Sequence, residues 1–162
     1  MDAMLGGAAE GAVRLKALVG RCPARPRSLF CHSYGSVVCG WLPTRPPPVA
    51  DIAVAGSPDA GRERRPVDTD ARIWAMRDRD DWIEDVPHLS FGGIGHGADP
   101  VDPAFGARLV SAAGASGHSG YFEPGTESLG NLAAIGVGAY GSVRCATADG
   151  ACRSGISGER ET

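Results

Sequence analysis

The sequence of 162 residues lacks three things: a long hydrophobic run, an excess of positive charge and a C-x-x-C pair. A membrane-spanning helix needs about 20 consecutive apolar residues, so we expect no membrane span. The N-terminus also lacks the apolar segment of a signal peptide, and we therefore expect a soluble, cytoplasmic protein. A net charge of -3 gives no reason to expect binding to nucleic acid.

The five cysteines are an odd number and indicate no simple framework of disulfides. We interpret them as small buried residues that carry free thiols. A bridge between Cys145 and Cys152 is an alternative, because the chain around these two residues is rich in glycine.

The overall composition, 43% hydrophobic and 22% charged, is typical of a globular protein. A chain of this length forms one domain and can bury a core. The 24 glycines and 12 prolines indicate short elements joined by many loops. We predict a single domain over residues 1–142, followed by a flexible C-terminal tail over residues 143–162.

Short apolar segments alternate with helical patterns along the chain. Helices are predicted where apolar residues recur at helical spacing, over residues 2–19, 34–41 and 129–140. Buried strands are predicted over residues 28–31, 49–55, 71–76 and 107–110. This alternation favours an α/β fold, in which a mainly parallel sheet is flanked by helices.

The segment around Ser33 reads as a short strand, a sharp turn and a helix made of small residues. This is the local pattern of a nucleophile elbow, in which a strained turn lifts a serine hydroxyl out of the sheet. Such a serine needs a base that takes its proton and a third group that orients the base. In the alternative interpretation, Ser33 only caps the following helix.

Acidic residues and a histidine follow in the order that such a site needs. Asp78, Asp80 and Asp81 come after the third predicted strand, and His118 comes after the fourth. The carboxyl ends of parallel strands meet at one edge of a sheet. We therefore predict that His118 takes the proton of Ser33 and that Asp81 orients the imidazole. Asp81 is preferred because the D-W-I sequence that begins there can anchor the turn, and Asp80 is the second choice.

Three further predictions concern residues around this site. The backbone N–H of Tyr34, directly after the nucleophile, is predicted to donate to an oxyanion. His32 is interpreted as a packing or polar-network residue that points away from the site. A metal site formed by His96, Asp99 and Asp102 is an alternative, but their spacing matches no strong ligand pattern. We therefore expect neither a metal nor a cofactor.

Six motifs occur in order along the chain: C-H-S-Y-G-S (31–36), A-G-S-P (55–58), I-W-A-M-R-D-R-D-D-W-I (73–83), G-H-G-A-D-P-V-D-P-A-F-G-A-R (95–108), G-H-S-G-Y-F (117–122) and S-L-G-N-L-A-A-I (128–135). The series resembles a bacterial α/β-hydrolase family of unassigned substrate, over about residues 28–138. The resemblance implies a serine hydrolase that cleaves a small-molecule ester, thioester or amide. It also implies that Ser33 is the nucleophile, Asp81 the acid and His118 the base.

The chain departs from that family in two places. The first glycine of the elbow is Cys31 here, and its side chain should crowd the turn at a cost of about 1–3 kcal/mol. The family has several strands before the elbow, whereas only about 30 residues precede Ser33. We therefore expect an N-terminally truncated α/β-hydrolase-like fold whose first strand is an exposed edge, available for self-association.

Three functions are compatible with these residues. The first is a serine hydrolase that uses the predicted triad. The second is a catalytically inactive remnant or binding module that retains the motifs without a complete oxyanion hole. The third is a metal-dependent hydrolase built around His96, whose activity would survive removal of the Ser33 hydroxyl.

Overall fold

A computed structural model describes most of the chain, over residues 2–24, 27–43, 48–58, 69–85 and 99–156. Its centre is a sheet of four parallel strands in the order β1-β2-β3-β4. The strands are β1 (Ser28–His32), β2 (Asp51–Ala55), β3 (Arg72–Met76) and β4 (Arg108–Leu109). Each of them lies within two residues of a predicted strand, and the prediction of a parallel α/β sheet is confirmed.

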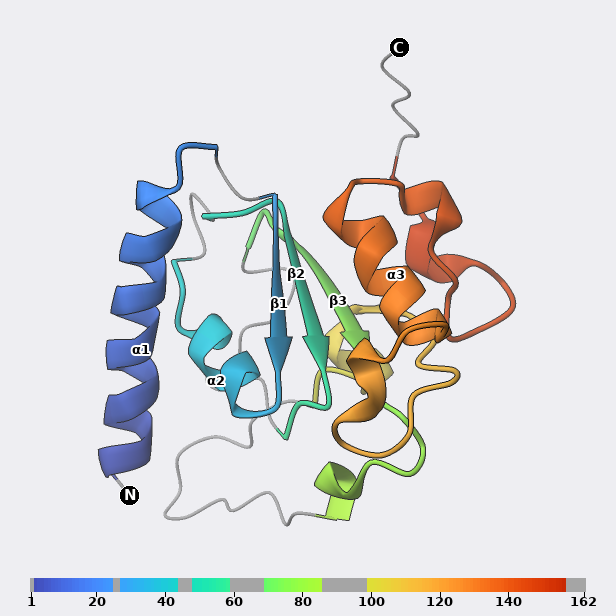
Figure 1. Cartoon of the computed structure of the whole chain (residues 1–162), viewed down its shortest axis with the longest axis horizontal. Coiled ribbons are helices and arrows are strands. Elements are labelled where there is room, and N and C mark those ends of the chain that lie inside the picture. The colour runs from blue at the N-terminus through green and yellow to red at the C-terminus, as the bar shows by residue number, and fades with distance from the viewer. Residues whose placement is uncertain (1, 25–26, 44–47, 59–68, 86–98, 157–162) are drawn as a thin grey trace.

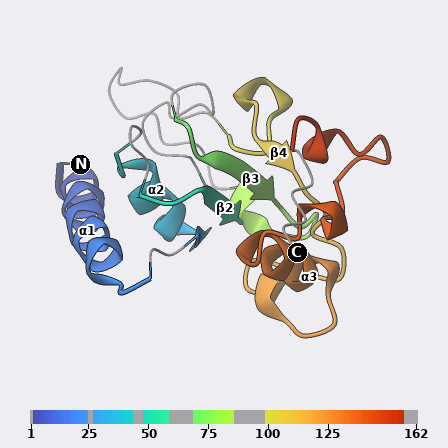
Figure 2. The ribbon, with the colours of Figure 1, turned by 90° about the horizontal axis from the view of Figure 1, so that it is seen from above.

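Helices lie on both faces of the sheet (Figures 1 and 2). One face carries α2 (Tyr34–Gly40) with α1 (Asp2–Arg21) beside it, and the other carries α3 (Glu127–Gly136). All three helices are predicted from the sequence, but α3 ends four residues earlier than expected. Gly138 has a φ of 74°, and this left-handed conformation just beyond a helix commonly ends it. Within the described residues, short 3-10 helices span Trp82–Asp85, Pro103–Phe105, Gly120–Phe122, Tyr140–Ser142 and Ala151–Arg153.

The strand β2 is buried along its whole length, which explains its apolar sequence from Ile52 to Ala55. Ile52 and Val54 face the cluster formed with α1 and α2. Ala53 and Ala55 face the opposite cluster, which includes residues of α3. The sheet is thus the middle layer of three, and only the ends of its strands open towards loops.

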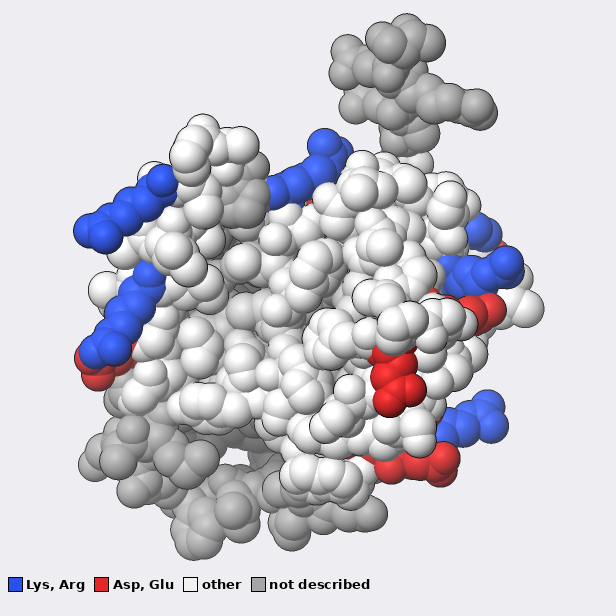
Figure 3. Space-filling model, in the orientation of Figure 1, with Lys and Arg blue, Asp and Glu red and all other residues white. Residues whose placement is uncertain are grey.

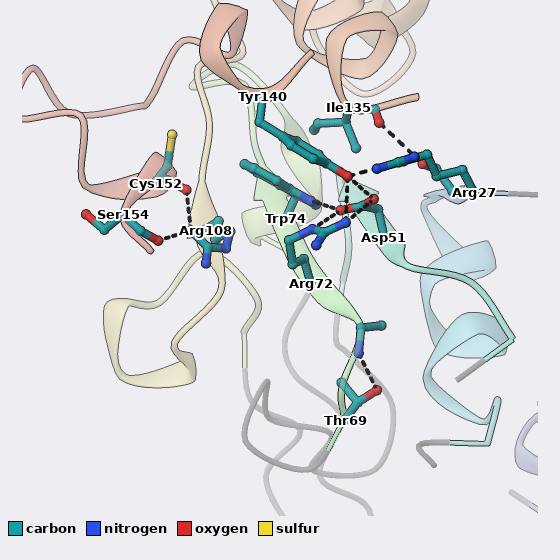
Figure 4. A network of polar contacts seen from close by, with 12 residues as sticks. Arg27, Asp51, Thr69, Arg72, Trp74, Arg108, Ile135, Tyr140, Cys152 and Ser154 are labelled. Carbon is teal, nitrogen blue, oxygen red and sulfur yellow. Dashed lines mark hydrogen bonds and ion pairs between the residues drawn. The ribbon is translucent and has the colours of Figure 1, made fainter. Parts of the chain in front are cut away.

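The first residue of β2, Asp51, is a buried carboxylate at the N-terminal end of the sheet (Figure 4). Arg72 donates to both of its oxygens at 2.7 and 2.9 Å. The indole of Trp74 and the hydroxyl of Tyr140 also donate to it, at 2.9 and 2.7 Å. Burial alone would raise the pKa of Asp51, but these hydrogen bonds outweigh burial and hold that pKa below its ordinary value of 3.8. The network ties two strands to the C-terminal segment.

Residues 143–156, which the sequence predicts to be part of a flexible tail, are packed against the sheet. Val143 and Cys152 are buried in the same cluster as the residues of α3. Val110, which directly follows β4, forms an antiparallel bridge with Cys145, so this segment pairs with the chain just beyond the end of β4. The side chain of Asn131 also accepts from the backbone N–H of Arg144 at 2.7 Å. The expected tail is wrong for these residues, and residues 157–162 lie outside the described part of the chain.

Four of the five cysteines form disulfides, Cys31–Cys39 and Cys145–Cys152. The interpretation of these four as free thiols is wrong. The Cys145–Cys152 bridge is an alternative that the sequence leaves open, whereas the Cys31–Cys39 bridge is not predicted from the sequence. After the turn at Ser33 the helix α2 folds back along β1, which brings the Cα atoms of Cys31 and Cys39 to 6.5 Å from each other. The remaining cysteine, Cys22, is an exposed free thiol.

The strand β1 lies at one edge of the sheet, as predicted, and its Phe30 is 45% exposed. In the view that looks onto β1, most charged side chains lie towards the periphery, and the surface over the middle of β1 is uncharged (Figures 1 and 3). Among the described residues, none of the helices combines the length and the apolar character that a bilayer-spanning segment requires.

Candidate active site

Ser33 occupies a sharp turn between the end of β1 and the start of α2. Its φ of 53° is the one positive φ of a non-glycine residue in the described part of the chain, and its ψ is -130°. Such backbone strain costs about 1–3 kcal/mol and persists only where the surroundings enforce it. Here Ser33 donates its N–H to the Ala55 carbonyl at 3.1 Å, and its own carbonyl accepts from the N–H and hydroxyl of Ser36. The predicted elbow is therefore present as a backbone conformation.

A continuous line of hydrogen bonds joins the three residues predicted to form a triad. The Oγ of Ser33 lies 2.8 Å from Nε2 of His118, and Nδ1 of His118 lies 2.8 Å from Oδ1 of Asp81. The side chain of His118 is 12% exposed and that of Asp81 is fully buried. An ionised carboxylate only accepts, so Nδ1 of His118 donates to Asp81, and in a neutral imidazole Nε2 is then the acceptor of the serine hydroxyl.

These residues meet because each of them follows the carboxyl end of a strand. Ser33 follows β1, Asp81 follows β3, and His118 comes after β4. All four strands run in the same direction, so these ends gather at one edge of the sheet (Figure 1). Ser33, Asp81 and His118 are therefore close in space although they are far apart in the chain.

Asp81 is held in place by two donors besides the imidazole. The hydroxyl of Tyr121, itself fully buried, donates to Oδ2 at 2.5 Å, and the N–H of Ile83 donates to Oδ1 at 3.0 Å. Burial raises the pKa of Asp81, but hydrogen bonds from Tyr121, Ile83 and His118 bring it below the ordinary value of 3.8. Burial and the bond to Asp81 raise the pKa of Tyr121 far above its ordinary value, so Tyr121 remains a donor.

The neighbouring aspartates have other partners. Asp80, the second choice for the acid, is exposed, and its backbone N–H donates to Oδ2 of Asp78 at 3.3 Å. Oδ2 of Asp78 accepts from the N–H of Gly117 at 2.9 Å, which ties the loop before His118 to the end of β3. Of the two alternatives that the sequence leaves open, the geometry favours Asp81.

Two residues of this site have no role assigned from the sequence, Gly56 and Tyr121. Gly56 has a φ of 56°, and a Cβ there would lie 2.7 Å from Oδ2 of Asp81 and 3.2 Å from Nδ1 of His118. Only a glycine leaves room for the side chains of Asp81 and His118 at this position. Both residues belong to the quoted motifs, A-G-S-P and G-H-S-G-Y-F, and these motifs are the signal that could have identified them.

The expectation that His32 points away from the site is wrong. Its Nε2 lies 2.6 Å from the carbonyl oxygen of His118, and its ring is 4.8 Å from the imidazole of His118. Alternation of side chains holds within a strand, and it fails across the turn because Ser33 has a positive φ. The ring of Trp82, 56% exposed, also lies 4.8 Å from the imidazole of His118, and Phe122 is an exposed neighbour of His32. The rings of His32 and Trp82 therefore lie against the imidazole of His118.

The alternative metal ligands do not come together in the described part of the chain. His96 lies outside the described residues. Asp99 accepts from the guanidinium of Arg77 at 2.7 Å, and Asp102 caps a 3-10 helix by accepting from the N–H of Ala104 at 2.8 Å. Among the residues that the structure describes, no group of three potential ligands is found.

Comparison with known proteins identifies the family. Residues 1–91, more than half of the chain, match the family described as alpha/beta hydrolase. The matched range contains Ser33 and Asp81, and His118 lies beyond it. Comparisons with curated proteins and with solved structures give no significant match. The family match agrees with the parallel sheet and its flanking helices, and the chain therefore belongs to the alpha/beta hydrolase family.

Proposed function

We propose that this protein is a serine hydrolase that works through an acyl-enzyme, with Ser33 as nucleophile, His118 as base and Asp81 as orienting acid. The observation that carries the proposal is the hydrogen-bonded line from Ser33 through His118 to the buried Asp81, built on a strained elbow. A helix cap explains neither the positive φ of Ser33 nor the orientation of both imidazole nitrogens. Moreover, the Ser33 side chain makes no capping hydrogen bond to α2.

In the first half of the reaction, Oγ of Ser33 attacks the substrate carbonyl while Nε2 of His118 takes the hydroxyl proton. The carboxylate of Asp81 stabilises the imidazolium that forms and keeps its Nδ1 proton directed away from the serine. The imidazolium then returns its proton to the leaving alcohol, thiol or amine. In the second half, a water molecule attacks the acyl-enzyme while Nε2 of His118 takes its proton. The imidazolium then returns this proton to Oγ of Ser33, and the carboxylic acid product leaves.

The backbone N–H of Tyr34 is the proposed oxyanion donor, because the residue after the nucleophile has this role in an elbow. Loss of one such donor typically costs about 3 kcal/mol of transition-state stabilisation. We propose a small-molecule ester, thioester or amide as the substrate class, since each presents a carbonyl to the serine.

A fluorophosphonate probe tests the proposal, because it reacts covalently with activated serines. We expect an adduct on Ser33, located by peptide mass spectrometry, that is absent in Ser33→Ala and much reduced in His118→Ala. The labelled protein must be folded, as judged by circular dichroism. Folded protein that acquires no adduct contradicts the enzyme proposal and favours the inactive binding module. Chelator-sensitive hydrolysis that persists in Ser33→Ala favours the metal-dependent alternative.

The location of the protein is a separate question. The cytoplasm predicted from the sequence stays a prediction, and the two disulfides of the described chain argue against it. Disulfides persist in oxidising compartments and are rare in a reducing cytosol. Self-association through the β1 edge also stays a proposal. Light scattering on the purified protein would test it, because a monomer at all concentrations contradicts edge pairing.

A further inference from the structure

His32 lies between the strand of the nucleophile and the loop that carries the base. It is the last residue of β1, and its Nε2 lies 2.6 Å from the backbone carbonyl oxygen of His118. A carbonyl oxygen only accepts, so Nε2 of His32 carries a proton and donates it. One hydrogen bond therefore joins the residue before Ser33 to the backbone of His118.

Aromatic rings of that loop surround the imidazole of His32. Its centroid is 4.8 Å from the ring of His118, and the rings of Tyr121 and Phe122 follow at 5.8 and 5.7 Å. The ring of Phe122 stands nearly perpendicular to it, at 87°. Edge-to-face contacts of this kind favour one orientation of a ring. Here they hold Nε2 towards the carbonyl.

The sheet itself does not set the distance between the nucleophile and the base. Ser33 follows β1 and His118 follows β4, and these two strands form opposite edges of the sheet. Adjacent strands lie about 4.8 Å apart, so three strand spacings of roughly 14 Å separate these edges. The loop of His118 must return across the ends of the strands, and side-chain contacts determine where it stops.

Two of those contacts attach the loop to the exit of β3. Asp78 accepts from the N–H of Gly117 at 2.9 Å, and Asp81 accepts from the imidazole of His118 at 2.8 Å. Neither contact involves β1. The bond from His32 attaches the same loop to β1, directly beside the nucleophile.

We propose that His32 is a positioning residue that holds His118 within hydrogen-bond distance of Ser33. The inference rests on the proposed serine-hydrolase function. His32 transfers no proton in the reaction, because its Nε2–H is directed at a carbonyl oxygen. Without that bond the loop shifts relative to β1, and a displacement of 1 Å at a reacting group can reduce the rate by about 100-fold.

Two substitutions separate the hydrogen bond from the ring contacts. His32→Phe keeps an aromatic ring and removes the donor, whereas His32→Gln keeps an N–H at a similar distance from the backbone. Ser28→Ala is the matched control, since Ser28 is also on β1 and its hydroxyl donates to the carbonyl of Ile135 at 3.4 Å, at the other end of the strand. The measurements are the maximal rate of labelling by a fluorophosphonate and the probe concentration at half that rate.

We expect His32→Phe to lower the maximal labelling rate by about 10- to 100-fold without changing the half-saturating concentration. His32→Gln should recover most of this rate, and Ser28→Ala should equal the wild type. Labelling of His32→Phe at the wild-type rate overturns the inference. So does a glutamine variant that is no faster than the phenylalanine variant while both are folded.

A second measurement does not depend on activity. Nitrogen-15 NMR of the wild-type imidazoles should show opposite tautomers, with the proton of His32 on Nε2 and that of His118 on Nδ1. A His32 whose Nε2 is unprotonated overturns the inference, whatever the enzyme does. Absence of labelling in a wild-type protein that shows both tautomers contradicts the proposed function, while the bond between His32 and the loop stands.

Discussion

Two fully buried aspartates lie at opposite ends of the sheet, and they are bound by different kinds of partner. At the N-terminal end, Asp51 receives both arms of an arginine together with a tyrosine hydroxyl and an indole N–H (Figure 4). At the C-terminal end, Asp81 receives a tyrosine hydroxyl, a backbone N–H and the imidazole of His118. Both carboxyl groups have a pKa below the ordinary value.

The difference lies in the cationic partner. The guanidinium of Arg72 is always charged, so the negative charge of Asp51 is compensated permanently. This pair therefore has no proton to take up or release near neutral pH. An imidazole, unlike a guanidinium, can exist with or without a charge, and the other nitrogen of His118 faces the hydroxyl of Ser33. At one end of the sheet the buried carboxylate is thus paired with a permanent cation, and at the other it lies where the proposed mechanism requires a transient imidazolium to be stabilised.

The largest expected effect is that of Asp81→Asn. We expect labelling or hydrolysis to fall by about 10,000-fold, because an amide neither stabilises the imidazolium nor selects the Nδ1–H tautomer. The free energy of unfolding should change by less than in Asp51→Asn, because Asp81 has no permanently charged partner that its neutralisation would leave uncompensated. The measurements are fluorophosphonate kinetics and urea denaturation. Asp80→Asn is the matched control, and an equal loss in that variant would show that the acid is misassigned.

Asp51→Asn should have the opposite profile. Removal of one partner of a buried ion pair leaves the other uncompensated and costs about 3 kcal/mol of unfolding free energy. Activity per folded molecule should remain that of the wild type. Urea denaturation measures the first quantity and active-site titration the second. Asp102→Asn is the control, because asparagine caps about as well as aspartate. A stable Asp51→Asn variant with low activity would contradict the distinction between a structural Asp51 and a functional Asp81.

A matched pair of tyrosine variants tests the comparison between Asp51 and Asp81 with a smaller change, the loss of one hydroxyl group. Tyr121→Phe and Tyr140→Phe each remove one hydroxyl that donates to a buried aspartate. A hydrogen bond to a charged group is worth about 1.5–3 kcal/mol. In Tyr140→Phe we expect the unfolding free energy to fall by this amount and the labelling rate to stay unchanged. Tyr121→Phe should also slow labelling by about 10-fold, because Asp81 becomes less firmly oriented. Equal labelling rates in both variants would contradict a role of Tyr121 in the site.

The smallest expected effect is the dependence of stability on pH. The pKa of Asp51 is lower in the folded protein than its ordinary value of 3.8, so folding favours the ionised carboxylate. This contribution is fully present above about pH 4 and is lost as the pH falls through the folded pKa. The difference in unfolding free energy between wild type and Asp51→Asn should therefore shrink between pH 5 and pH 3. A difference that grows on acidification would contradict the lowered pKa.

Much of the fold and of the candidate site can be predicted from the residues in their order. The buried strands are visible as apolar runs, and the parallel sheet follows from their alternation with helices. The turn at Ser33 has a local pattern, and the positions of Asp81 and His118 after later strands place them at the same edge. These features depend on short segments of chain and on the rule that parallel strands end on one side.

Other features depend on how the segments pack together, and only the tertiary structure decided them. The disulfide of Cys31 with Cys39 arises because α2 folds back along β1. The contact of His32 with the loop of His118 depends on how that loop crosses the ends of the strands.

The same is true of the C-terminal segment and of the residues that set the surroundings of the two aspartates. Residues 143–156 are rich in small residues that indicate no packing by themselves, and they become ordered by docking on β4 and α3. The space left by Gly56 matters only because Asp81 and His118 approach it. The sequence by itself determined which chemical groups are present and at which edge of the sheet they emerge. The packing of distant segments decided which of them touch, because a hydrogen bond requires a precision in position that local patterns do not encode.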